Sequence, residues 1–115
     1  MIEKKFETVM LNNGKKKLTI VFLDKKYALL STLFFVEIGA FGNWIKENIT
    51  AVLQGEAEEK NISGNICELV IQKENTTIYD MLADDGMGNW CSVPTWELLS
   101  LIDEWLEQKA LLEQS

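Results

Sequence analysis

The chain has 115 residues, of which 47% are hydrophobic, and a formal net charge of −7 at pH 7. This size and apolar content predict a single domain over residues 1–115 that buries roughly two-thirds of its unfolded surface. There is no histidine, which excludes Ser-His-Asp triads and nearly all zinc enzyme sites. There is also no arginine, which excludes bidentate recognition of phosphate or guanine.

The charge is unevenly distributed along the chain. Residues 1–36 carry seven lysines and three acids, a net of +4, whereas residues 37–115 carry four lysines and fifteen acids, a net of −11. The acidic part should repel nucleic acid and attract basic protein partners. No uninterrupted run of ~18 apolar residues and no secretory signal is present, so we expect a soluble cytoplasmic protein without a membrane partner.

Cys67 and Cys91 lack the Cys-x-x-Cys spacing of redox and metal sites. In a reducing compartment they are expected to be small buried side chains. A disulfide between them is the less favoured alternative.

The first element in chain order is a predicted β-hairpin over residues 3–23. Two alternating runs are joined by Asn12-Asn13-Gly14, and Asn-Gly favours a tight two-residue turn. That turn pairs apolar residues across the hairpin, Val9 with Leu18 and Phe6 with Val21. Lys15, Lys16 and Lys17 follow the turn, as expected for a solvated hairpin end or a protected strand edge.

Residues 27–42 are ambiguous between helix and strand. Leu30, Leu33, Phe34, Ile38 and Phe41 recur at helical spacing, but the stretch LFFV has the composition of a buried strand. We favour a strand that ends near Ile38. A helix follows at 43–54, with Gly55 as its C-terminal stop and a shared apolar face made by Trp44, Ile45, Ile49, Val52 and Leu53.

The polar segment 55–65 is predicted to be a linker or the end of that helix. Residues 66–72 and 76–81 form a second hairpin, 83–89 a loop, and 90–93 a short strand. A helix with Thr95 as N-cap continues to about Lys109 and then frays. The predicted fold class is α+β, with an antiparallel sheet built from hairpins and packed by two or three helices.

Four tryptophans are many for a small domain. Trp44 and Trp105 lie on apolar helix faces and are expected in the core. Trp90 and Trp96 adjoin the acidic loop and a helix start; a core position is favoured for both, and a role as an exposed anchor for a partner stays open.

The stretch YDMLADDGMGNWC places Asp80, Asp84 and Asp85 near Gly86. Aligned on that glycine, an EF-hand pattern fails at three of its four ligand positions. The two adjacent aspartates also lack the fixed, partly buried geometry of catalytic carboxylates. We therefore predict no catalytic residue, no bound metal and no cofactor. A metal-dependent enzyme that uses the three aspartates is the third-ranked alternative.

Six acidic residues form a candidate docking face for a basic protein. The alternative interpretation is that these charges only keep the protein soluble. They are Glu56, Glu58, Glu59, Asp80, Asp84 and Asp85.

Three stretches stand out in the second half of the chain: Ser63-Gly64-Asn65, Thr77-Ile78-Tyr79-Asp80, and Val93-Pro94-Thr95-Trp96-Glu97-Leu98-Leu99 leading to Trp105. Through them residues 41–109 resemble small bacterial immunity proteins, including those of contact-dependent growth inhibition. The resemblance implies a cytoplasmic protein that binds the C-terminal toxin domain encoded beside it, often a basic nuclease, and blocks its active site or an essential surface.

The leading hypothesis is therefore neutralisation of a toxin by binding. The six acidic residues would meet a basic face of the toxin, with Trp90 as an apolar anchor. The alternative is a non-catalytic structural or regulatory module, with a homodimer through the exposed edge of the N-terminal hairpin as one form.

Overall fold

The computed structural model describes residues 2–82 and 89–114. Its elements in chain order are β1 (Lys4–Met10), β2 (Lys16–Phe22), the 3-10 turn η1 (Lys25–Tyr27), α1 (Ala28–Thr32), the π-helical segment η2 (Leu33–Ile38), α2 (Gly39–Leu53), β3 (Glu59–Ser63), β4 (Cys67–Gln72), β5 (Asn75–Asp80), β6 (Trp90–Pro94) and α3 (Thr95–Glu113).

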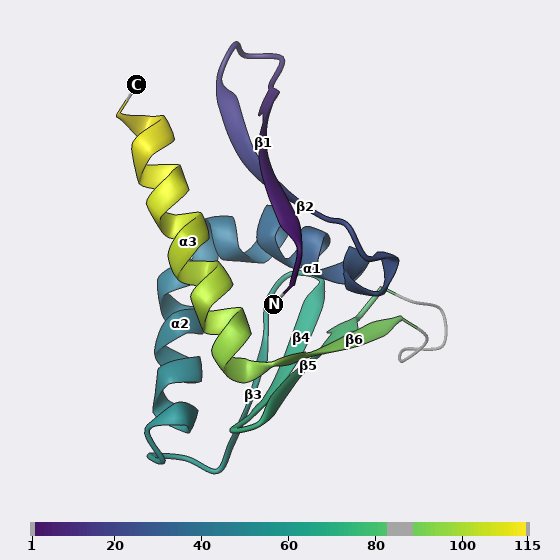
Figure 1. The fold of residues 1–115 in the computed structure, drawn as a ribbon, viewed down its shortest axis with the longest axis vertical. Helices are drawn as coiled ribbons and strands as arrows, with labels where there is room; N and C mark the ends of the chain where they lie inside the picture. The colour runs from purple at the N-terminus through teal and green to yellow at the C-terminus, as the bar shows by residue number, and fades with distance from the viewer. Residues whose placement is uncertain (1, 83–88, 115) are drawn as a thin grey trace.

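The two sheets and the helices confirm the predicted α+β class. β1 and β2 form a separate two-stranded sheet, whereas β3, β4, β5 and β6 pair in that order as an antiparallel meander. In Figure 1, α2 and α3 lie side by side along the four-stranded sheet. The β1–β2 hairpin extends away from that sheet, and β2 contacts α3.

The predicted hairpin is present, but its register is shifted by one residue. Phe6 lies opposite Ile20, and Leu18 lies opposite Thr8. The connection is a three-residue loop in which the Leu11 carbonyl accepts from the Gly14 N–H at 2.9 Å. Gly14 has a φ of +82°, the left-handed conformation that closes such loops. The predicted two-residue turn is therefore wrong.

This register decides which face of the hairpin is buried. Leu18, Ile20 and Phe22 alternate along β2 and all enter the core, whereas Val9 and Val21 are exposed. A one-residue shift reverses the faces of a strand, so the predicted apolar pairs are not formed.

Residues 25–53 are helical, so the strand predicted to end near Ile38 is wrong. The helical spacing noted in the sequence places Leu30, Leu33, Phe34 and Ile38 on one completely buried side. Burial of such side chains contributes about 1.5–3 kcal/mol each, which outweighs the strand-like local composition. Phe41, also at that spacing, is exposed.

By length and composition the helical run Lys25–Leu53 could cross a membrane, with a hydropathy of 1.5 in its most apolar window. In this fold 44% of that window is buried. The run contacts β2, the four-stranded sheet and α3.

The predicted helix at 43–54 is confirmed, and it begins earlier, at Gly39. Its end has the hydrogen bonds of a Schellman motif, with Gly55 N donating to Val52 O and Glu56 N donating to Ala51 O. Gly55 has a φ of +81°, in agreement with its predicted role as the stop. Trp44 is 45% exposed, so its predicted core position is wrong.

The segment predicted to be a linker contains an edge strand. Residues 59–63 form β3, which pairs with β4 from Glu59 opposite Gln72 to Ser63 opposite Glu68. Only Ile62 in this strand is buried. One apolar residue gives too little alternation to reveal a strand in the sequence.

The remaining strands confirm the predicted second hairpin and the short strand after it. Cys67 in β4 and Cys91 in β6 are buried free thiols, as expected. β5 lies between these two strands. The separation across two strand spacings is about 10 Å, beyond the reach of a disulfide, so the bridge kept as an alternative is not formed.

α3 begins without the predicted cap. Pro94 occupies the N-cap position, and Thr95 is the first helical residue. The Thr95 hydroxyl is buried, where it donates to the Gln72 carbonyl and bonds the Thr76 hydroxyl at 2.8 Å. The helix continues to Glu113 rather than fraying after Lys109.

A buried carboxylate joins the helical layer to the sheet. Glu37, in η2, is 0% exposed. It accepts hydrogen bonds from three successive backbone N–H groups, those of Asn65, Ile66 and Cys67, at 2.9, 3.2 and 3.0 Å. These bonds satisfy the donors of the β3–β4 turn and offset the cost of burying the charge. The carboxylate lies beside Gly64, whose lack of a side chain makes room for it.

Candidate interaction surface

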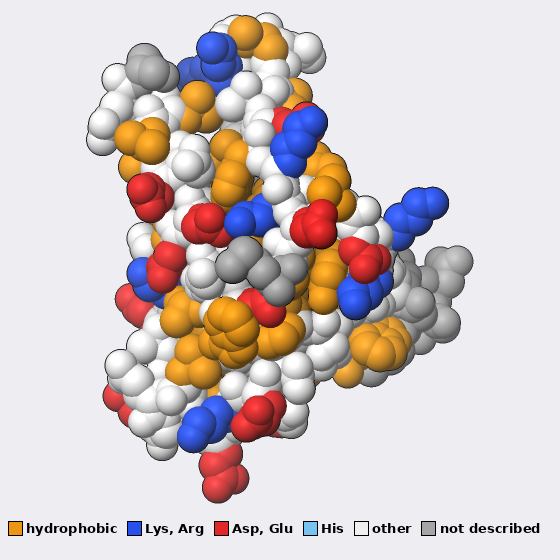
Figure 2. All heavy atoms as spheres, in the orientation of Figure 1, with side chains coloured by type: hydrophobic (Ala, Val, Ile, Leu, Met, Phe, Trp, Pro, Cys, Tyr) orange, Lys and Arg blue, Asp and Glu red, His pale blue; other side chains and the backbone are white. Residues whose placement is uncertain are grey.

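The acidic residues predicted to form one docking face are divided between two regions. Glu56, Glu58 and Glu59 are all exposed, in the α2–β3 connection and the start of β3. Glu59 accepts from the Gln72 side chain at 2.6 Å. Figure 2 shows acidic side chains at this end of the molecule, beside a basic patch.

Asp80 lies at the other end of the sheet. The β5 strand runs from Asn75, beside the Glu59 end, to Asp80, a length of about 17 Å. The Asp80 carboxylate accepts from Leu82 N at 2.9 Å and from Asn89 Nδ2 at 3.2 Å. It therefore fixes both ends of the connection between β5 and β6. Asp84 and Asp85 fall outside the described residues.

Trp90 lies near Asp80, because it starts β6 opposite Tyr79. It is 57% exposed, and Trp96 at the start of α3 is 61% exposed, so the core position favoured for both is wrong. Of the four tryptophans only Trp105 is in the core, as predicted. In Figure 2, hydrophobic side chains gather over the start of α3 and near β6. Exposed indoles of this kind are common anchors in protein interfaces.

The sequence did not reveal a second exposed aromatic group, on α2. Phe41 and Trp44 form an edge-to-face pair with ring centroids 6.4 Å apart. Both are more than one-third exposed. Phe41 departs from helical geometry, with φ −122° and ψ 19°. The helical spacing predicted a core position for Trp44 only, and the departure of Phe41 from helical geometry could not be inferred from it.

Neither cysteine thiol is activated as a nucleophile or as a metal ligand. Burial raises the pKa of Cys67 to about 12, and the carboxylates of Glu37 and Asp80 add to the effect. Burial also raises the pKa of Cys91 to about 11. Both thiols are protonated at neutral pH and so are poor nucleophiles and poor metal ligands. Within residues 2–82 and 89–114, no three His, Cys, Asp or Glu side chains gather in a metal-binding arrangement.

The comparison with known proteins assigns the family. The chain is 41% identical over 100 residues to an immunity protein of Bacillus cereus, a match that covers 87% of this chain and 83% of the relative. This chain therefore belongs to the immunity proteins. No family profile and no solved structure matches it.

Proposed function

We propose that this protein neutralises a cognate toxin by forming a tight stoichiometric complex with it in the cytoplasm. The observation that carries the proposal is the extended identity to the Bacillus cereus immunity protein. The exposed tryptophans also support it, because they offer apolar contact area on a surface that is otherwise rich in charge.

The proposed partner is the C-terminal domain of a polymorphic toxin, of the contact-dependent growth inhibition type, with nuclease activity. The acidic charge of residues 37–115 supports this choice. Nuclease domains are commonly basic, since they bind polyanions, and an acidic inhibitor can cover the surface that nucleic acid would occupy. Charge complementarity would also accelerate association.

We place the toxin contact at the β5–β6 end of the sheet. Trp90, Met81 and Leu82 are exposed there, next to Asp80 and the sequence positions of Asp84 and Asp85. An apolar centre with acidic surroundings is the arrangement that a basic partner would match. Glu56, Glu58 and Glu59 lie at the far end of β5, so in this placement they are at the rim of the contact, where charges contribute less to affinity.

Charge reversal at each end of the sheet tests this placement. The toxin domain is expressed in a bacterial host with the wild-type chain, with Asp84→Lys/Asp85→Lys, or with Glu56→Lys/Glu58→Lys. The proposal predicts rescue of growth by the wild type and by the second variant, and reduced rescue by the first. Equal rescue by both variants would remove the β5–β6 end from the interface. No rescue by the wild type would overturn the proposed function.

A further inference from the structure

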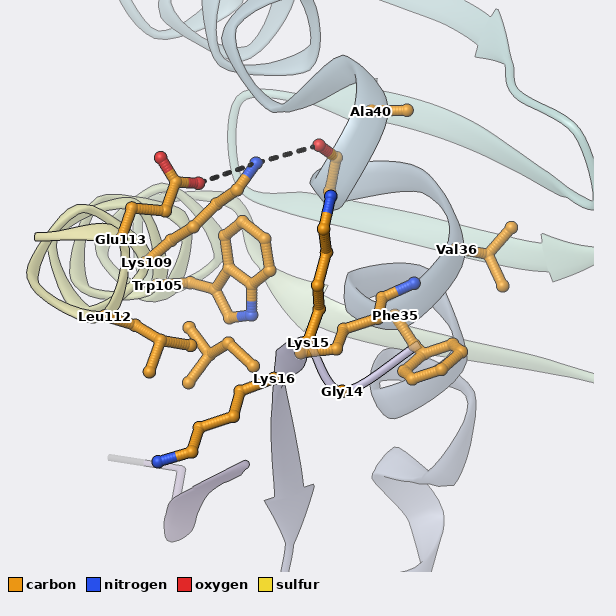
Figure 3. Close-up of a pocket in the computed structure, with 13 residues that line it drawn as sticks. Gly14, Lys15, Lys16, Phe35, Val36, Ala40, Trp105, Lys109, Leu112 and Glu113 are labelled. Carbon is orange, nitrogen blue, oxygen red and sulfur yellow. Dashed lines mark hydrogen bonds and ion pairs between the residues drawn. The ribbon is translucent and has the colours of Figure 1, made fainter. Parts of the chain in front are cut away.

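A pocket of about 840 Å³ opens between the hairpin turn, the π-helical segment and the C-terminal half of α3. Figure 3 shows its walls: Lys15 and Lys16 from the hairpin, Phe35 and Val36 from η2, and Trp105 and Lys109 from α3. The lysines at the hairpin turn, which were expected to mark a solvated hairpin end or a protected strand edge, therefore form one side of a concave surface.

The charge of this pocket is opposite to that of the whole chain. Its lining includes four lysines, Lys15, Lys16, Lys17 and Lys109, and a single carboxylate, Glu113. The protein as a whole has a net charge of −7. The excess of acidic residues already keeps the protein soluble. Solubility therefore does not explain why four lysines line one pocket.

Two of the four lysines are engaged within the fold. Lys109 donates to the Gly39 carbonyl at 3.2 Å and lies 3.9 Å from the Glu113 carboxylate. The Lys17 ammonium lies 3.9 Å from the centroid of the Phe35 ring. Lys15 and Lys16 are exposed and make no ion pair with any described residue. Their charges are therefore available to a partner.

The same pocket contains a buried donor without an acceptor. Trp105 is 2% exposed, and its indole Nε1 is the one buried side-chain polar atom without a hydrogen-bond partner among the described residues. In Figure 3 this nitrogen is turned toward the start of β2, where Lys16 lies. An unsatisfied buried donor is costly, and an acceptor brought in by a partner would remove that cost.

We propose that this pocket receives an acidic segment of the cognate toxin domain. An Asp or Glu carboxylate of the toxin would lie between the ammonium groups of Lys15 and Lys16, and an adjacent apolar side chain would pack on Phe35 and Val36. The inference rests on the proposed function. It adds a second contact with the toxin, in which this protein contributes positive charge, whereas at the β5–β6 end it contributes negative charge. The proposed partner is a protein, and the anionic side chains of a protein are the carboxylates of Asp and Glu.

The test measures Kd for the purified toxin domain against matched variants. Lys15→Glu/Lys16→Glu reverses the pocket charge, and Lys25→Glu/Lys26→Glu makes the same charge change at exposed lysines in η1. Ala40→Trp fills the pocket from α2 without a change of charge. We expect the first variant to bind at least tenfold more weakly, Ala40→Trp to bind several-fold more weakly, and the η1 variant to retain wild-type affinity. A toxin Asp or Glu changed to Lys should restore binding to Lys15→Glu/Lys16→Glu.

The outcomes separate this inference from the proposed function. If the wild-type chain binds the toxin and all three variants bind equally well, the pocket is not a contact site and the inference is overturned alone. If the wild type does not bind, the proposed function fails and the inference fails with it. Self-association of the wild type that the two pocket variants abolish, with toxin binding unchanged, would show a second copy as the occupant and would also overturn it. Far-UV circular dichroism confirms that each variant is folded.

Discussion

Gly64 leaves the space that the Glu37 carboxylate occupies. A Cβ atom on Gly64 would lie 2.0 Å from Glu37 Oε2 and 2.4 Å from Cδ, far inside van der Waals contact. The carboxylate is held in place by three backbone N–H donors, so it has no free direction in which to move. The Ser63-Gly64-Asn65 turn, noted in the sequence as part of the family resemblance, is thus half of a contact between the sheet and the helical layer.

Gly64→Ala should therefore destabilise the protein strongly. We expect a loss of about 3 kcal/mol or more in the free energy of unfolding, because either the turn or Glu37 must move. Gly39→Ala is the control, since its Cβ would meet only the Trp105 side chain at an ordinary 3.8 Å. It should be neutral or stabilising by up to about 1 kcal/mol, since alanine is the better helix former. Urea denaturation measures both, and equal stabilities would contradict the account.

Glu37→Ala should also destabilise the protein, by about 2–4 kcal/mol, because it leaves buried N–H groups without acceptors. The informative experiment is the double-mutant cycle with Gly64→Ala. Once the carboxylate is gone, the added methyl group has space, so Gly64→Ala should cost far less in the Glu37→Ala background than in the wild type. Additive losses would show that the two residues act independently.

The Thr95 hydroxyl is predicted to stabilise the fold as a bridge from α3 to the end of β4 and to β5 rather than as a helix cap. Thr95→Val keeps the shape but loses both hydrogen bonds, and we expect a loss of about 1–3 kcal/mol. Thr95→Ser keeps the hydroxyl and should lose less. Thermal unfolding of the two variants distinguishes these effects. A larger loss for Thr95→Ser than for Thr95→Val would assign the role of Thr95 to its methyl group.

Stability should fall between pH 9 and about pH 11 because of the buried thiols. Above pH 9 the thiols of the unfolded chain ionise, whereas in the folded protein the pKa values of Cys67 and Cys91 are raised to about 12 and about 11. The folded state then holds more protons, so stability declines as pH rises, by at most about 1.4 kcal/mol per pH unit for each thiol. Urea denaturation at pH 8 to 10 should give a shallower decline for Cys67→Ala/Cys91→Ala. An unchanged slope would refute the assignment.

Long-range contacts account for most of what the sequence did not reveal. The second hairpin, α3 and the α2 end at Gly55 follow from local patterns, and they were predicted. The strand-like residues 33–36 are helical because that conformation buries Leu30, Leu33, Phe34 and Ile38 together on one side. Glu37 lies within that apolar run, and nothing local indicates that its partners are the N–H groups of residues 65–67.

The spatial arrangement of the predicted site residues also depends on long-range contacts that the sequence does not show. Sequence identified acidic residues and Trp90 but could not place Glu56 and Asp80 at opposite ends of the sheet, because their separation depends on the strand order. It identified Lys15, Lys16 and Lys17 as the end of a hairpin. That this end faces α3 and forms a pocket follows only from how the two sheets pack against the helices.

The most direct test of toxin neutralisation by binding is a titration of the purified toxin domain with this protein. The residual toxin activity is measured at each step of the titration. Stoichiometric inhibition predicts a linear fall that reaches zero at one equivalent, together with a one-to-one complex in sedimentation. Full activity at several equivalents would contradict the account. Complete loss of activity at a small fraction of one equivalent would contradict it as well, because one molecule would then inactivate many toxins by catalysis rather than by binding.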